Sequence, residues 1–447
     1  MKKKLIAIPL FVLVVFSENV RTEEFNIFSH GAKAAGMANA VVARALDPST
    51  VWYNPAGITQ LKGFQIYAGG ALLQTGERKY FSIYRNHTLT GDSVSHILPD
   101  FFLTGPITKR LRFGLGVTSP IQYDIEWPKT SEVEHLVYIV QKMRLRSAAV
   151  TPVLAITLSD RLSLGAGLSF NFSDIQIRYH YPYDTNVLVA MLTNGKVMDV
   201  PDILFELHDF NTQKISYFAG LQWRFLPAFS FGATYRRGLP LTSDSGNVYA
   251  LQPETSDAYA NGVLAGLFPD TPAQSAVIAF SLADQIQTGL ACRIGNRLEV
   301  ELDVSWIFWS QMEKLSVDYS RETSFAAAWS GYEDIDAELD FRDVSHWRLG
   351  AEFALTPAIG LRFGAFTKGS PVCGKYVNPA FPLAASRGFS LGLGYHNDRF
   401  MVDLAYVFEA VSELSGTNGI LSRWGDTSQK YPSRRDHCAL LHAGVKF

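Results

Sequence analysis

The feature that most constrains this chain is a residue-by-residue alternation of apolar and polar side chains that recurs along its length. Between Leu298 and Trp306 every second residue is apolar, and Glu299, Glu301 and Asp303 lie among the residues between them. Successive side chains of a β-strand point to opposite faces, so this period indicates strands with one apolar and one polar face. Such strands bury the apolar row either in a soluble core or in membrane lipid.

The alternation recurs in about fourteen segments, at residues 64–74, 97–104, 111–119, 144–157, 162–175, 215–225, 229–236, 275–294, 298–306, 347–355, 361–366, 389–396, 400–409 and 439–447. An even number of strands is typical of bacterial barrels. Short turns, as at 159–161 and 295–297, alternate with longer connections. Outer-membrane barrels have short periplasmic turns and long outer loops, so the pattern favours an all-β membrane protein, a fourteen-stranded antiparallel barrel.

The start of the chain predicts export. Three lysines at positions 2–4 precede an apolar run from Leu5 to Phe16, and polar residues follow. This layout is typical of a secretory signal, so we predict a signal peptide over residues 1–22. After this segment no run of 18 apolar residues occurs, which excludes helical membrane spans. Such a chain enters a membrane only as a barrel, and the bacterial outer membrane is its expected location.

The segment after the signal does not follow the strand pattern. Residues 29–45 are rich in small side chains and favour helix, and Asn54 and Pro55 are turn-forming residues. Small side chains allow close backbone packing, which a plug inside a barrel needs and a free extension does not. We therefore predict a hatch over residues 23–63 and a barrel over residues 64–447.

The hatch segment and several strands resemble one known family. Residues 31–40, followed by Trp-Tyr-Asn-Pro-Ala-Gly at 52–57, are similar to the hatch of the FadL family of outer-membrane transporters for long-chain fatty acids and aromatic hydrocarbons. Residues 113–120, 162–168, 231–236 and 347–353 look like family segments in family order. The resemblance implies a monomeric fourteen-stranded barrel closed by a hatch. One departure is Phe381 to Arg387, where many members carry an acidic stretch.

The resemblance also implies a gate and an exit. The hatch and gating residues would be Gly31, Lys33, Arg44, Asn54, Pro55 and Ala56. A kink in the third strand, carried by Gly114, Gly116 and Pro120, would open a lateral exit, because glycine weakens a strand and proline cannot donate to the ladder. In a regular strand the same glycines would simply relieve crowding in the lumen.

Two long connections, near 178–213 and 242–272, contain apolar clusters that would collect the ligand. The residues predicted to bind it are Val187, Leu188, Met191, Leu192, Leu204, Phe205, Leu264, Leu267 and Phe268. The predicted cations for a carboxylate headgroup are Arg362 and Lys368, with Lys33 and Arg44 of the hatch. The alternative is that the loop clusters pack on each other and that the cations pair with acids of the lumen.

Other functions remain as alternatives. A polar porin could keep the hatch only as a structural plug, and a barrel hydrolase could use His396 or His442 with Asp403. The Gly-x-Ser-x-Gly sequence at 388–392 needs a strand-to-helix turn, but alternation runs through it. Neither the histidine spacing nor the three scattered cysteines indicates a metal site. The first choice is therefore a transporter of hydrophobic compounds, above all long-chain fatty acids, without catalytic residues or cofactor.

The last strand suggests further partners. Phe447 ends an alternating segment, which is similar to the signal that barrel-assembly machinery recognises. With a net charge of −2 and 18% charged residues, the chain has no positive field suited to nucleic acid. The expected partners are a hydrophobic small molecule, outer-membrane lipid and the assembly machinery.

Overall fold

The computed structural model describes residues 23–24, 29–82, 87–91, 93–127, 141–180, 195, 204–251, 258–267, 274–320, 334–374, 377, 380–417 and 428–447. The predicted signal peptide lies outside these residues. Within them, helices are short, and none has the length and apolar character that crossing a membrane requires.

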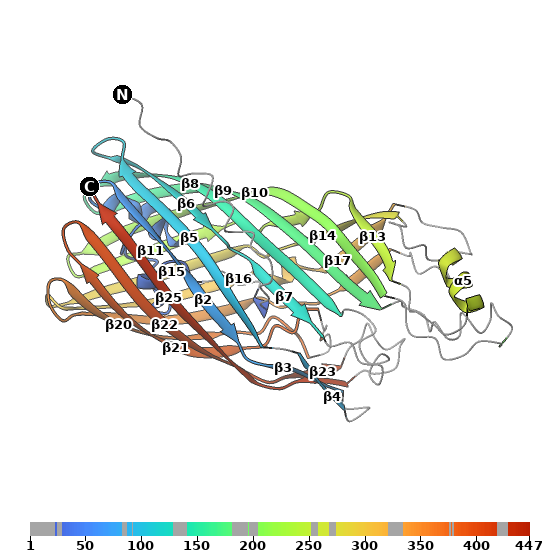
Figure 1. Cartoon of the computed structure of the whole chain (residues 1–447). Helices are drawn as coiled ribbons and strands as arrows, with labels where there is room; N and C mark the ends of the chain where they lie inside the picture. Colours follow the sequence, from blue (N-terminus) through green and yellow to red (C-terminus); the bar gives the residue numbers. More distant parts are fainter. Residues whose placement is uncertain are drawn as a thin grey trace.

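The fold is a closed antiparallel β-barrel, in which the first barrel strand pairs with the last (Figure 1). Its fourteen strands are β2 (Gln65–Thr75), β5 (Val94–Pro106), β6 (Leu111–Thr118), β8 (Lys142–Ser159), β9 (Leu162–His180), β10 (Leu204–Leu226), β11 (Phe229–Arg236), β15 (Gln285–Ile294), β16 (Leu298–Ile307), β19 (Val344–Ala354), β20 (Ile359–Lys368), β21 (Ser386–His396), β22 (Phe400–Val411) and β25 (Arg434–Lys446). The predicted strand number and barrel class are confirmed.

Shorter elements extend the barrel at the end away from Phe447 (Figure 1). They are β7 (Gln122–Glu126), β12 (Pro240–Thr242), β13 (Gly246–Leu251), β14 (Gln274–Ser281), β17 (Lys314–Tyr319), β18 (Ile335–Glu338), the helix α5 (Ala258–Leu267), the turn η3 (Trp309–Gln311), and a separate sheet of β3 (Arg78–Ser82), β4 (His87–Gly91), β23 (Leu414–Thr417) and β24 (Ser428–Tyr431). The strand β1 (Glu23–Glu24) pairs with β7. The short turns all lie at the opposite end, beside Phe447, so that end is periplasmic.

One predicted strand, 275–294, is wrong as a single element. The structure divides it into β14 and β15, with residues 282–284 between them. Asp284 accepts a hydrogen bond from the backbone N–H of Gly238 at 2.7 Å and another from the Tyr235 hydroxyl at 2.6 Å. Because Leu282 and Ala283 continue the apolar character of the strand into this break, periodicity does not detect it.

The apolar rows of the strands face outward. On β22, Val402 and Leu404 are exposed, whereas Asp403 between them is fully buried. Along this strand the outward apolar row begins at Phe400 and reaches Phe408. A rise of about 3.4 Å per residue and a tilt of about 40° give this row a height of roughly 20 Å, close to the apolar band of an outer-membrane barrel. The outward rows therefore meet lipid.

The segment after residue 29 lies inside the barrel, where Figure 1 shows it in blue. It contains α2 (Ala32–Ala35), α3 (Thr50–Tyr53) and η1 (Pro55–Gln60), and we call residues 29–62 the hatch segment. It contacts β8, β9 and β10 on one side and β21, β22 and β25 on the other. Close approach depends on wall glycines, since a Cβ on Gly165 would lie 2.4 Å from the Pro55 carbonyl carbon.

Candidate functional site

Carboxylates of β16 hold the middle of the hatch segment. Asp303 accepts hydrogen bonds from the backbone N–H groups of Val41 and Val42 at 2.8 and 3.1 Å. Glu301 accepts from the N–H of Ala43 and from the Arg44 side chain, at 2.5 and 2.8 Å. The two acids are buried, so these bonds form away from water. They tie an irregular stretch of backbone, which has no ladder of its own, to the barrel wall.

Asn54 forms a second anchor on β10, which is separated from β16 by β11 and β15. Its amide nitrogen donates to the carbonyl of Val42 at 2.7 Å and to the carbonyl of Leu221 on β10 at 3.0 Å. Its side-chain oxygen accepts from the N–H of Ala56 at 3.1 Å, which begins η1. The predicted gating residues Asn54, Pro55 and Ala56 therefore lie buried between the hatch segment and the wall.

The start of the hatch segment is held by β5 and β25. Asp100 accepts from the backbone N–H of Gly31 at 3.2 Å and pairs with His442. The other ring nitrogen of His442 accepts from the N–H of Ala32 at 3.2 Å. Burial lowers the pKa of His30, whose ring nitrogen lies 3.4 Å from Asp100. The hatch segment is thus fixed at three separate places on the wall.

The cations predicted to bind a headgroup are paired with acids. Lys33 lies 3.2 Å from Glu352, and Arg362 bonds to Glu352 and Asp403 at 3.0 and 2.6 Å. These side chains form a continuous buried network.

The remaining two candidates are paired as well. Arg44 pairs with Glu299 and Glu301, and Lys368 lies 2.9 Å from Glu409. The expected alternative, that the cations pair with lumen acids, describes all four of them.

Arg236, which sequence reasoning did not select, is differently placed. Its guanidinium lies 4.2 Å from the ring centroids of Trp52 and Phe218, and it donates to the Trp52 carbonyl at 2.6 Å. Among the residues that the structure describes, no carboxylate lies within ion-pair distance of it. A lone arginine at a strand end gives no sequence signal. It becomes conspicuous only when the other lumen cations are seen to be paired.

Two neighbouring cavities lie beside the hatch segment. The larger holds about 1160 Å³, including space open to solvent, and is lined by hatch residues Asn39 and Tyr53 and by wall residues such as Lys368. The smaller holds about 610 Å³ and reaches Pro120. Arg236 and Trp52 line both. Arg236 therefore stands at the junction of the two spaces.

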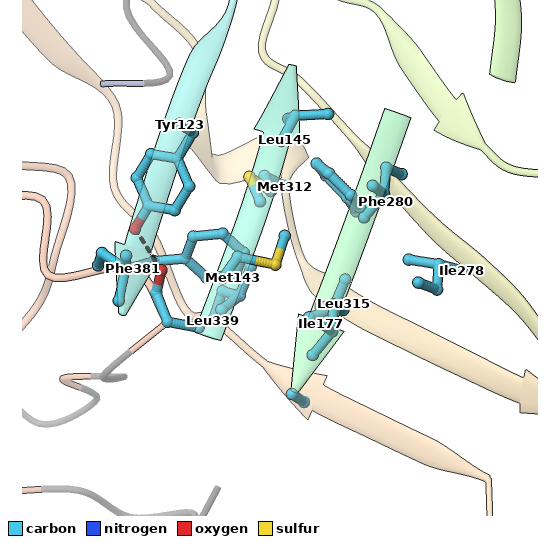
Figure 2. Packing of buried hydrophobic residues seen from close by; sticks show 14 of the residues in the cluster. Tyr123, Met143, Leu145, Ile177, Ile278, Phe280, Met312, Leu315, Leu339 and Phe381 are labelled. Atoms are coloured by element: carbon cyan, nitrogen blue, oxygen red, sulfur yellow. Dashed lines mark hydrogen bonds between the residues drawn. The ribbon is translucent and has the colours of Figure 1, made fainter. Parts of the chain in front are cut away.

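Beyond these cavities, at the end away from Phe447, the barrel is filled with apolar side chains, and we call this part the upper barrel. Figure 2 shows Met143, Leu145, Ile177 and Phe280 directed into one cluster from different strands. Phe381, in the stretch that departs from the family pattern, joins this cluster and lies 5.9 Å from the ring of Tyr123. An acidic stretch is thus replaced here by apolar packing.

The predicted collecting residues fall in different places. Phe205 is buried in the apolar cluster, whereas Leu204 is only partly buried. Leu264 and Leu267 belong to α5. The other predicted residues, Val187, Leu188, Met191, Leu192 and Phe268, lie outside the described part of the chain. The predicted loop groove therefore stays a prediction.

The wall is interrupted after β6. The pairing of β5 with β6 ends at Phe101 and Val117, and the next strand, β7, pairs with β8 and β1 and has no register with β5. Residues 119–121, which include Pro120, lie between β6 and β7 and oppose residues 147–148 of β8. This extra residue makes a bulge, and bulges bend the strand that carries them.

The two predicted kink glycines lie below this break. Gly114 and Gly116 are in the regularly paired part of β6, facing the hatch segment. A Cβ on Gly114 would lie 2.6 Å from Val51. The structure therefore places the bend at residues 119–121. The glycines make room for the hatch segment, in line with the alternative that they relieve crowding in the lumen.

Of the pairs considered for catalysis, the structure brings His396 to Asp403, whereas His442 pairs with Asp100. His396 lies 2.9 Å from Asp403, which also binds Arg362. Ser390, the serine of the Gly-x-Ser-x-Gly sequence, lies within β21 and accepts from the N–H of Ala38 at 2.9 Å. In the described ranges, no three His, Cys, Asp or Glu side chains group as metal ligands. The arrangement serves hatch attachment.

The sequence matches a family described as outer membrane protein transport protein (OMPP1/FadL/TodX), over residues 13–440. An outer membrane protein of Neisseria meningitidis serogroup B is 23% identical over 416 residues, covering 89% of this chain and 88% of that protein.

Solved structures have the same fold. A FadL homologue of Pseudomonas aeruginosa superposes with a TM-score of 0.71 at 17% identity, covering 96% of this chain and 100% of that chain. The Pseudomonas putida toluene transporter TodX gives 0.69 at 15% identity, with 94% and 99% covered. The Ralstonia pickettii toluene transporter TbuX gives 0.66 at 15% identity, with 95% and 100% covered. At these identities the likeness concerns the fold.

Proposed function

The chain belongs to the OMPP1/FadL/TodX family of outer-membrane transport proteins for hydrophobic compounds, and on that premise we propose that it carries amphipathic acids, above all long-chain fatty acids. The observation that carries this proposal is Arg236. It is a lumen cation without a carboxylate partner among the described residues, at the junction of two cavities. A fatty acid supplies what this position lacks, a carboxylate, together with an apolar tail.

The surroundings of Arg236 suit such a ligand. The rings of Trp52 and Phe218 flank the guanidinium and leave its edge to hydrogen bonding. Buried apolar side chains of the upper barrel, such as Phe280 and Ile278, give the tail a favourable surface. A water-filled porin would instead need a polar path. The hatch segment, which contacts both sides of the wall, argues against such a path.

Aromatic hydrocarbons are the second candidate. TodX and TbuX, which have the same fold, are toluene transporters. Toluene has no charge, so it would use the apolar cluster without engaging Arg236. The two substrate classes therefore differ in their dependence on this one residue.

Arg236→Gln is expected to reduce saturable oleate uptake by roughly tenfold or more, because a hydrogen bond to a charged group contributes about 1.5–3 kcal/mol. Toluene uptake should change little. The measurement is uptake of labelled oleate and labelled toluene by transport-deficient cells that express each variant. Arg237→Gln is the matched control, since Arg237 is exposed and pairs with Asp284. Equal loss in both variants, or toluene uptake alone, would exclude the fatty-acid assignment.

We further propose that the ligand leaves sideways through the interruption between β5 and β7. The inward-facing residues change from even numbers on β6, such as Gly116, to odd numbers on β7, such as Tyr123. One extra residue at 119–121 causes this change, because it shifts every later side chain to the other face. The same residue turns β7 away from β5. A lateral exit would release an apolar ligand into lipid without passage through water.

Deletion of Pro120 is expected to restore continuous pairing between β5 and the third strand and to lower uptake of either ligand to background. Pro120→Ala keeps the extra residue, so uptake should persist. Both variants need a check of barrel folding by the heat-dependent shift of the band on denaturing gels. Undiminished uptake by a folded deletion variant would rule out this exit.

A further inference from the structure

Two arginines on the outer surface of the barrel lie on either side of one small residue. Arg387 of β21 and Arg435 of β25 are both in register with Ala410 of β22, the strand between them. Both side chains are exposed, whereas Ser386 and Asp436 next to them are buried. The arginines therefore point away from the lumen, on the same face as the apolar rows.

An aromatic row lies two residues below this pair. Phe389, Phe408 and His437 are in register across the same three strands, with ring centroids 5.2 Å apart for Phe389 and Phe408 and 5.4 Å apart for Phe408 and His437. Aromatic girdles mark the interface between the apolar band and the lipid headgroups. A step of two residues is about 7 Å along the strand, so the arginines lie at headgroup level.

This end of the barrel faces the outer leaflet. The strands continue from here towards β23 and β24, away from Phe447 and the short periplasmic turns. What covers the outward surface at this level is lipid, because the apolar rows directly below already stand in the membrane. The outer leaflet of this membrane is built from a phosphorylated glycolipid, whose phosphates lie just above the acyl chains.

The two guanidinium groups have no partner among the residues that the structure describes. Throughout the described parts of the chain, neither Arg387 nor Arg435 forms an ion pair or side-chain hydrogen bond. Some outward cations on other strands have acid partners. Arg144, for example, lies 3.2 Å from Asp174. The free pair is therefore a local feature and not the general state of the surface.

The spacing suits a single phosphate. Neighbouring strands lie about 4.8 Å apart, which separates the Cα atoms of Arg387 and Arg435 by roughly 10 Å. Ala410 between them is small, so the two arginine side chains can lean towards each other over its methyl group on the outer surface. Arginine presents a planar fork of donors that matches phosphate oxygens.

We propose that Arg387 and Arg435 bind a phosphate group of the outer-leaflet glycolipid. The inference rests on the outer-membrane location and not on the substrate, so it stands or falls independently of the fatty-acid proposal. The bound lipid would fix the outer surface of β21, β22 and β25 at headgroup level. Such a contact gives the barrel a defined depth in the membrane close to β5, because β25 pairs with β2 and β2 pairs with β5.

The test is a titration of the purified barrel in detergent with bisphosphorylated lipid A, followed by native mass spectrometry. The double variant R387Q/R435Q is expected to bind at least tenfold more weakly than the natural sequence. R399Q is the matched control, because Arg399 lies beside Phe400 at the periplasmic end of the same lipid-facing surface. It should bind like the natural sequence. Because all three positions are on the outside, the barrel should fold in every case.

Two competitor ligands complete the test. The natural sequence and R387Q/R435Q should bind dephosphorylated lipid A with equal affinity. Inorganic phosphate should not compete with lipid A for the natural sequence at equal concentration. Unchanged affinity of R387Q/R435Q for lipid A would overturn the proposal. Equal weakening by R399Q, or full competition by inorganic phosphate, would overturn it too, because the site would then lack either position or lipid specificity.

Discussion

Replacing both Asp303 and Glu301 with leucine is expected to detach the hatch segment from β16 and to open the barrel to ions. The two carboxylates accept three backbone N–H groups of residues 41–43 and pair with Arg44. Each buried donor left unpaired costs about 1–3 kcal/mol, and Arg44 loses Glu301 while it keeps Glu299. The attached state should therefore no longer be favoured.

The measurement is single-channel conductance in planar bilayers, supported by the sensitivity of cells to a large hydrophilic antibiotic. Glu299→Leu is the matched control, since Glu299 also pairs with Arg44 but accepts no hydrogen bond from the hatch backbone in the described residues. It should leave conductance low. A silent channel in a correctly folded double variant would show that β16 is not what retains the hatch segment.

Arg362→Met is expected to destabilise the barrel by about 3–5 kcal/mol, because it leaves a buried carboxylate without its cation. Arg362 is 1% exposed and Asp403 is fully buried, and their side chains are 2.6 Å apart. Glu352, the second partner of Arg362, keeps Lys33. The loss therefore falls mainly on Asp403. The measurement is the urea midpoint of unfolding in lipid vesicles.

A double-mutant cycle separates the ion pair from packing. Asp403→Leu in the Arg362→Met background removes the stranded charge, so the double variant should be more stable than the sum of the two single losses predicts. Tyr67 and His396 also bond to Asp403, which limits the recovery. Simple additivity of the two losses would show that Arg362 contributes through its volume and not through its charge.

The strands could be predicted because lipid and lumen impose opposite demands on neighbouring residues. Val402 and Asp403 on β22 differ in kind for that reason, and so do Leu302 and Asp303 on β16. The break between β14 and β15 was missed, because Leu282 and Ala283 at the break are apolar like the strand before them. The kink was predicted at Gly114, Gly116 and Pro120, and the register puts the extra residue at 119–121, which includes Pro120 but neither glycine. The extra residue is recognised only when residues 119–121 are counted against residues 147–148 of β8.

The site was harder to predict than the fold. Arg44 and Glu301 are 257 residues apart in the sequence, so no local pattern indicates that they pair. For the same reason the sequence offered Arg362 and Lys368 as free cations and did not offer Arg236. Which arginine is free depends on where all the acids lie, and this is a property of the closed barrel.

The pairing of β2 with β25 sets a condition on how the molecule is made. These strands are joined over more than three hundred residues of chain, from Thr75 to Arg434. Until β25 docks, β2 keeps a row of unpaired backbone groups, and such an edge is a template for joining other chains. Loops this long close slowly. Every newly made copy therefore passes through an interval in which its first strand must be shielded, and the speed of its last step decides how many copies escape aggregation.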